Sequence, residues 1–296
     1  MNPLDTLSRY RKTFARNLPF YLAGGLLVLC MKYSYSQADA GSLLWILAPT
    51  TWLVTFLTGI PFSYVHDAGY ANHSLRILIA PTCSGVRFLT ILFTALFFSF
   101  VHRVGTQGRL VYTTCKKGRT SNTPWHMGAR AGWMGVCLLL SYLCTILTNS
   151  LRIVASLYLP PLLEQAGLLQ GMLTPHRLHT LIGILTYLPS LLALYHMTEK
   201  FFRKAEGIRR NTGTDLHLPP SCKKAALAQL ARACVPPLCW YLLLTLGIPL
   251  LGRAYAQNPG AFAEYTLLIL LGCFLILVPC CMIALLSGHF LRGRQP

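Results

Sequence analysis

Three side chains suited to acyl-transfer chemistry stand at the ends of strongly apolar runs of this sequence. Cys83 directly precedes such a run within IAPTCSGVRFLTILFTALFFSF, residues 79–100. Arg152 follows the run VCLLLSYLCTILTNSL, and His179 stands in TPHRLHTLIG, where the next run begins. A thiol, an imidazole and a permanent cation are the groups that a cysteine acyl-transfer site requires. We expect His179 to take the thiol proton, the amino terminus of a helix to favour the Cys83 thiolate, and Arg152 to stabilise the oxyanion or orient the substrate.

The elements that must position these residues are membrane helices. Hydrophobic residues make up 54% of the 296-residue chain and charged residues only 11%, which is more apolar surface than one soluble core can hide. About 20 helical residues cross the hydrocarbon core of a bilayer. We therefore predict an all-α fold, a polytopic integral membrane helical bundle of about seven transmembrane helices, with residues 1–296 forming a single transmembrane domain. The predicted spans lie near residues 18–36, 43–62, 84–102, 131–151, 177–197, 234–252 and 265–290.

The charge of the chain indicates its orientation. A formal net charge of +18 would suggest nucleic-acid binding in a soluble protein, but here the basic residues cluster in loops, and no basic surface with interleaved aromatic residues accompanies them. Residues 102–130 hold six basic residues and no acidic residue, and residues 198–233 hold eight basic and three acidic residues. Such loops face the cytoplasm and anionic lipid. We expect no nucleic-acid partner, and we place Cys83 at the outer face of the cell membrane.

The amino-terminal segment conflicts with this orientation, because it is also basic. It contains Arg9, Arg11, Lys12 and Arg16. Two complete spans before Cys83 would leave this segment and Cys83 on the same side of the membrane. Either the amino terminus lies outside against the charge rule, or one of the first two apolar runs does not cross fully. The sequence leaves both alternatives open.

The three candidate residues reach the same outer level if the directions of the spans alternate. Asn149 and Arg152 are three residues apart and share a helix face. An ionisable residue at the lipid boundary is costly and is therefore a functional candidate. His179 lies one turn before Gly183, whose small size allows a neighbouring helix to approach. Structural explanations remain open for each, namely a packing cysteine, a snorkelling arginine and a helix-capping histidine, and His176 is an alternative to His179.

Other reactive residues give weaker signals. His66, Asp67 and His73 in the loop before Cys83 can bind a metal, steer a substrate or simply be solvated. The chain contains neither an H-E-x-x-H motif nor a C-x-x-C pair, so we expect no metal and no cofactor. The remaining cysteines of the apolar runs are predicted to pack as small hydrophobic residues. These are Cys30, Cys137, Cys144, Cys239, Cys273, Cys280 and Cys281.

The ordered segments APTCSGVRF, TNSLRI and HTLIG resemble the exosortase and archaeosortase family. The motifs of that family are a Cys-Ser-Gly or Cys-Ala-Gly box, an Asn-x-x-Arg box and a later histidine. The segment WILAPTTWLVTFLTGIPFSYVHDAGY also looks like the exosortase K branch. The resemblance covers about residues 43–197 and leaves the helices predicted over 234–290 unmatched.

The resemblance implies a role for each matching residue. Cys83 corresponds to the proposed nucleophile, with Ser84 and Gly85 completing its motif. Arg152 corresponds to the essential arginine, with Asn149 as its companion, and His179 corresponds to the histidine. The resemblance therefore implies catalytic roles for Cys83, Arg152 and His179, and substrate binding by Asn149, Ser84 and Gly85.

Family members are thought to cleave carboxy-terminal sorting signals of exported proteins. Such a signal consists of a short motif, a transmembrane helix and a basic tail, and the acyl group passes to a cell-surface acceptor. The resemblance thus implies a membrane cysteine protease and transpeptidase. The competing hypothesis is a polytopic transporter or channel-like protein without peptidase activity. The sequence leaves open the substrate motif, the acceptor and the oligomeric state.

Overall fold

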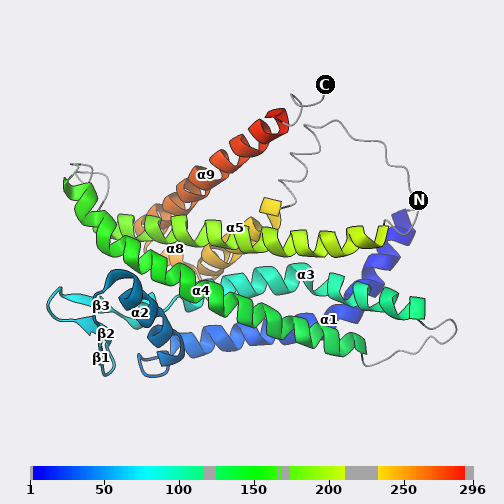
Figure 1. The fold of residues 1–296 in the computed structure, drawn as a ribbon, viewed down its shortest axis with the longest axis horizontal. Coiled ribbons are helices and arrows are strands. Elements are labelled where there is room, and N and C mark those ends of the chain that lie inside the picture. Colours follow the sequence, from blue (N-terminus) through cyan, green and yellow to red (C-terminus); the bar gives the residue numbers. More distant parts are fainter. Residues whose placement is uncertain (1–2, 116–124, 166, 168–173, 211–232, 291–296) are drawn as a thin grey trace. The chain divides into compact units, whose positions relative to one another are not determined.

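The computed structural model describes residues 3–115, 125–165, 167, 174–210 and 233–290, and these residues are predominantly helical (Figure 1). This agrees with the all-α prediction at the level of fold class. The chain divides into two compact units. The first comprises Met1–Pro49 and Phe62–Ile146, and the second comprises Thr50–Pro61 and Leu147–Pro296.

The core of the first unit is built on helix α3 (Val86–Cys115). Helix α1 (Pro3–Ser36) packs against it, and Gly24 lies so close to the Phe97 ring that a side chain there would clash. Phenylalanine and leucine recur on α3 at helical spacing, so one face of the helix is apolar and buried. The fully buried large side chains of α3 are Phe88, Leu92, Phe93, Leu96, Phe97 and Phe100.

A small antiparallel sheet precedes the Cys83 motif, and the sequence did not predict it. Strands β1 (Ser63–Val65), β2 (Gly69–Asn72) and β3 (Ile77–Ile79) are ordered β1-β2-β3. Gly69, with a φ of 116°, approaches the carbonyl oxygen of Ile79 too closely for any side chain. The glycine therefore permits the pairing of β2 with β3, and β3 leads directly into the Cys83 motif.

The second unit contains the later part of helix α4 (Trp125–Gln165) and helix α5 (Pro175–Arg210). The segment Ala233–Leu251 follows, including the π-helical stretch η2 (Leu243–Gly247) and α7 (Ile248–Leu251). Helices α8 (Ala254–Gln257) and α9 (Pro259–Phe290) complete the unit.

Helix α9 packs on helix α5. A Cβ added to Gly272 would lie 2.5 Å from Cγ2 of Ile184, so the glycine allows a close approach of the two helices. The Nε of Arg177 donates to Oε1 of Glu264 at 2.6 Å. This contact joins α5 to α9.

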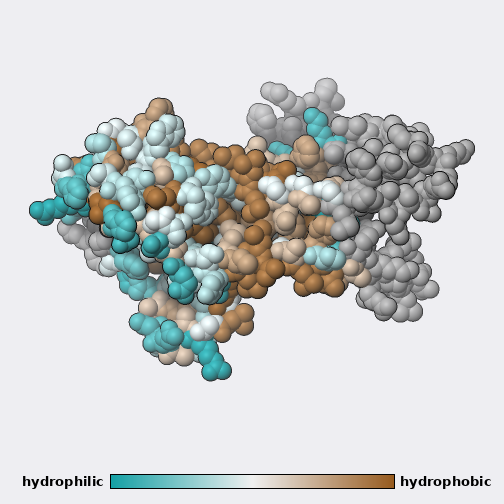
Figure 2. Space-filling model, turned by 90° about the horizontal axis from the view of Figure 1, so that it is seen from below, coloured by the Kyte–Doolittle hydropathy of each residue, from teal (hydrophilic) through white to brown (hydrophobic). Residues whose placement is uncertain are grey.

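Among the described residues, five helical segments are long and apolar enough to cross a membrane. Apolar side chains lie on the surface (Figure 2), including Leu139, Leu143 and Leu147 of α4, as expected for helices that face lipid. These observations indicate a membrane protein, but the predicted number of seven spans is not confirmed. The five segments are Pro81–Val104, Gly128–Gln165, His176–Lys204, Ala233–Leu251 and Pro259–Cys280.

The predicted span 43–62 corresponds to a much shorter helix, α2 (Leu44–Thr58). Its 15 residues extend about 22 Å at 1.5 Å per residue. The hydrocarbon core is about 30 Å thick. Helix α2 is therefore too short to cross by itself. The 34 residues of α1 extend about 51 Å, but α1 is not among the five described segments that are both long and apolar enough to cross, so the predicted span near residues 18–36 is not confirmed.

Candidate functional site

Cys83 ends a single 3₁₀ turn, η1 (Pro81–Cys83), and does not open helix α3 as predicted from the sequence. The Cys83 amide donates to the carbonyl oxygen of Ala80 at 2.8 Å. Ser84 and Gly85 then separate the cysteine from Val86, the first residue of α3. The dipole effect of a helix falls off within about one turn, so Cys83 lies at the margin of that effect.

Gly85 makes the turn between Cys83 and α3 possible. Its φ is 79°, a left-handed conformation that residues with a Cβ rarely adopt. Its carbonyl oxygen accepts the first hydrogen bond of α3, from the Leu89 amide at 3.0 Å. The motif thus requires glycine at this position because the backbone turns there from the 3₁₀ turn into the helix.

Ser84 lies completely buried between Cys83 and Gly85. Its Oγ has no hydrogen-bond partner among the described residues. A buried hydroxyl without a partner costs free energy. The predicted substrate-binding role of Ser84 stays a prediction, because its side chain has no exposed surface in this structure.

Arg152 lies at the centre of a polar network between α4 and α5 in the second unit. Its Nη1 donates to Oδ1 of Asn149 at 3.3 Å and to the hydroxyl of Tyr187 at 3.0 Å. Its Nη2 lies 2.5 Å from Nε2 of His179. The Tyr187 hydroxyl in turn donates to Oδ1 of Asn149 at 2.7 Å. The structure therefore brings Asn149, Arg152 and His179 together.

The donors and acceptors of this network determine the tautomer of His179. A guanidinium group offers five N–H donors and no acceptor. The Nε2 of His179 must therefore accept the hydrogen bond from Arg152, which leaves the ring proton on Nδ1. Nδ1 lies 3.4 Å from Oγ of Ser156, one turn after Arg152 on α4. In this arrangement Nε2 is occupied by Arg152.

Arg152 retains donors beyond these contacts. The hydrogen bonds to Asn149, Tyr187 and His179 use three of its five N–H groups. Its Nε is buried and has no hydrogen-bond partner among the described residues. An unused, buried, charged donor is suited to an oxygen atom that carries negative charge.

Gly183 allows Arg152 to cross the face of α5. A Cβ at this position would lie 3.5 Å from Nε and 3.9 Å from Cδ of Arg152. His179 lies one turn before Gly183 and Tyr187 one turn after it, so the guanidinium reaches both across the glycine. The sequence predicted a close neighbour at Gly183, and the structure identifies it as the Arg152 side chain.

Two residues of the network were missed from the sequence. Tyr187 follows His179 by eight residues and Gly183 by four, so the three share a face of α5. Ser156 follows Arg152 by four residues on α4. Both positions satisfy helical spacing, but a tyrosine or serine at such spacing is common on any membrane helix. Only the observed contacts distinguish them.

Arg152 does not end its helix, contrary to the sequence prediction. Helix α4 continues through Pro160 and Pro161 to Gln165. His176, the open alternative to His179, lies in the first turn of α5. Both histidines are exposed, and the contact with Arg152 is made by His179. Cys83 belongs to the first compact unit and this network to the second. The catalytic roles of all three residues stay predictions.

The other reactive residues form no metal site in the described parts of the chain. No group of three histidine, cysteine or acidic residues lies close enough there to hold a metal ion. Nδ1 of His66 lies 2.8 Å from Oδ2 of Asp67, and both side chains are exposed.

The remaining cysteines differ in their surroundings. Packing is confirmed for Cys137 and Cys273, which are buried, whereas Cys30 and Cys239 are exposed. Cys144 and Cys280 are partly buried, and the side chain of Cys281 lies outside the described set.

Comparison of the chain with protein-family models, with curated proteins and with solved structures gave no match.

Proposed function

We propose that this protein is a membrane-embedded cysteine peptidase and transpeptidase of the exosortase and archaeosortase type. Its substrates would be exported proteins that carry a short motif, one transmembrane helix and a basic tail at the carboxyl end. Cys83 is the nucleophile, and His179 and Arg152 act on the proton and on the carbonyl oxygen. The observation that carries the proposal is the contact of Arg152 with His179, because a cation and an imidazole lie together at the boundary of two apolar helices.

The reaction requires two acyl transfers. In the first, the Cys83 thiol loses its proton to His179 and the sulfur attacks the scissile carbonyl carbon. The tetrahedral intermediate collapses to a thioester, and the protonated His179 gives its proton to the departing amine of the carboxy-terminal fragment. In the second, an amine or hydroxyl of the acceptor, or water, attacks the thioester and restores the Cys83 thiol.

The Arg152–His179 contact would then represent the resting site. Nε2 cannot accept a thiol proton while it accepts an N–H of Arg152. A substrate carbonyl that draws the guanidinium toward its oxygen would free Nε2 for the proton and would supply the oxyanion with a charged donor. Asn149 and Tyr187 hold Nη1 throughout, so they limit the movement of the guanidinium.

The length of α2 suggests an orientation that removes the conflict among the charged segments. If α1 crosses and the 15-residue α2 does not, the basic amino terminus faces the cytoplasm and Cys83 faces outside. The basic residues of 102–130 and 198–233 then also face the cytoplasm. In this orientation the Cys83 motif and the Arg152–His179 pair lie on the outer side of the cell membrane, where exported substrates are found.

Substitution of the nucleophile tests the proposal. Cys83→Ala should abolish cleavage of a sorting-signal reporter while leaving membrane insertion intact, because no other group supplies the attacking sulfur. Cys137→Ala is the matched control, since Cys137 is buried on α4, 15 residues before Arg152 along the helix. Both proteins are expressed with the reporter, and its carboxy-terminal fragment is followed by immunoblot. If the Cys83→Ala protein still cleaves the reporter, Cys83 is not the nucleophile.

A solute transporter is the second candidate, and one feature of the structure favours it. The π-helical stretch Leu243–Gly247 interrupts the segment Ala233–Leu251. Such interruptions recur at functional sites, and broken helices bind solutes in transporters. The stretch LLTLG contains no ionisable side chain. A transporter has no requirement for a thiol at Cys83, so the Cys83→Ala experiment separates the two functions.

A further inference from the structure

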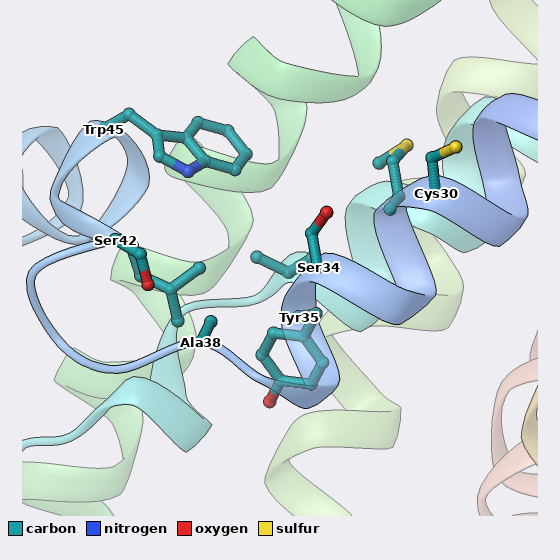
Figure 3. A pocket seen from close by; sticks show the side chains of 9 residues that line it. Cys30, Ser34, Tyr35, Ala38, Ser42 and Trp45 are labelled. Atoms are coloured by element: carbon teal, nitrogen blue, oxygen red, sulfur yellow. The ribbon is translucent and has the colours of Figure 1, made fainter.

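A cavity of about 300 Å³ lies in the first unit (Figure 3), and one of its nine lining residues, Val86, directly follows the Cys83-Ser84-Gly85 motif along the chain. Its size is at the lower end of the range for ligand-binding pockets in proteins. The walls come from the end of α1, the following loop, the start of α2 and the first residue of α3. The lining residues are Cys30, Met31, Ser34, Tyr35, Ala38, Ser42, Leu43, Trp45 and Val86.

The walls of this cavity are held in place by contacts outside it. Trp45 stacks on Tyr142 with ring centroids 5.7 Å apart, and the Tyr142 hydroxyl donates to the Trp45 carbonyl at 2.7 Å. The Arg87 guanidinium lies over the Tyr35 ring, 5.8 Å from its centroid. These contacts fix the positions of the Trp45 and Tyr35 rings, which form two aromatic walls of the cavity.

The loop at the cavity is also anchored. The Ser42 amide donates to Oδ1 of Asp39 at 2.8 Å, and the Ser42 hydroxyl donates to the Asp39 carbonyl at 3.1 Å. The hydrogen bonds from Ser42 hold the pKa of the Asp39 carboxyl below its usual value. The Ser42 hydroxyl keeps its acceptor capacity, so it is available to a peptide N–H.

The connection to the nucleophile is short. Val86 lines the cavity and follows Cys83 by three residues. At no more than about 3.6 Å per residue, their Cα atoms are at most about 11 Å apart. An extended peptide advances about 3.4 Å per residue. A substrate whose scissile carbonyl meets the Cys83 sulfur therefore reaches the cavity with a residue about three positions away.

We propose that this cavity binds an apolar side chain of the substrate peptide within about three residues of the scissile bond. The proposal rests on the proposed peptidase function and adds a specificity pocket to it. The lining is largely apolar and aromatic, and Ser34, Tyr35 and Ser42 are the lining residues that carry a hydroxyl group. Such a lining selects an apolar side chain and offers hydrogen bonds to the peptide backbone beside it.

Photocrosslinking from the cavity tests this assignment directly. Ser34 lines the cavity, whereas Ser36 ends α1 nearby and does not line it. Benzoylphenylalanine is introduced at Ser34 or at Ser36 in Cys83→Ala protein, which retains uncleaved substrate, and intact cells are irradiated. We expect a peptide adduct from Ser34 only, mapped by mass spectrometry to an apolar residue just outside a transmembrane helix that is followed by a basic tail.

The other outcomes test the specificity pocket and the peptidase function separately. An adduct with phospholipid alone, or equal adducts from Ser34 and Ser36, overturns the specificity pocket. A mapped peptide adduct with a protein that the parent leaves uncleaved supports the pocket and refutes the peptidase function. Cleavage by the parent of a protein that never crosslinks at Ser34 supports the peptidase function and refutes the pocket.

Filling the cavity gives a second measurement. Ser34→Phe should lower the initial cleavage rate of a reporter that carries the mapped sequence by about tenfold or more, because the bound side chain loses its apolar surroundings. Replacement of the mapped apolar residue by alanine in the reporter should make parent and Ser34→Phe protein similar. Ser36→Phe is the control and should match the parent. Equal rates for Ser34→Phe and the parent contradict the proposal.

Discussion

Replacement of Arg152 by lysine separates a catalytic arginine from a membrane anchor. Lysine keeps the positive charge and snorkels to the headgroups as well as arginine. It offers one nitrogen in place of three, and Arg152 uses two of its three, Nη1 for Asn149 and Tyr187 and Nη2 for His179. One ammonium group cannot occupy both positions, so Arg152→Lys must give up one side of the network.

The expected loss is large if the guanidinium acts on the reaction. A preorganised donor to an oxyanion contributes roughly 3 kcal/mol, which is on the order of a hundredfold in rate. We expect Arg152→Lys to insert normally but to cleave a sorting-signal reporter on the order of a hundredfold more slowly. The assay is the initial rate of release of the carboxy-terminal fragment, normalised to the amount of protein in the membrane.

A second arginine on the neighbouring helix provides the control. Arg177 on α5 pairs with Glu264 at 2.6 Å, and both side chains are partly exposed. An exposed ion pair contributes little, so Arg177→Lys should retain the rate of the parent. If Arg152→Lys also cleaves within about twofold of the parent, Arg152 is an anchor and the oxyanion argument fails.

Two further predictions concern Gly183 and the orientation of Cys83. Gly183→Ala should be tolerated because its Cβ would lie 3.5 Å from Nε of Arg152, but Gly183→Leu should displace the guanidinium and slow cleavage about as much as Arg152→Lys. A membrane-impermeant thiol reagent should label Cys83 in intact cells; labelling only after lysis would reverse the orientation.

The main apolar helices were predictable from the sequence. Runs of apolar residues are a local property, so α3, α4, α5, Ala233–Leu251 and α9 coincide with predicted spans. The shared helix face of Asn149 and Arg152 was also predictable from spacing alone, and their hydrogen bond confirms it.

Helix ends depend on interactions that the sequence shows less clearly. Proline lacks an N–H and usually ends or kinks a helix, yet α4 continues through Pro160 and Pro161. The apolar run at 43–62 suggested a span, but its helix has only 15 residues. The strands over residues 63–79 are too short for alternation to identify them.

The site itself depended on the tertiary structure. Periodicity gives the face of each helix, but the contact of Arg152 with His179 requires the relative rotation and register of α4 and α5. Those are set by packing, in particular by the small Gly183 beneath the Arg152 side chain. The sequence alone determined which residue types stand near the ends of apolar runs. The tertiary structure decided that Arg152 occupies Nε2 of His179 and that Tyr187 holds Arg152 in place, because both contacts join residues 27 or more positions apart.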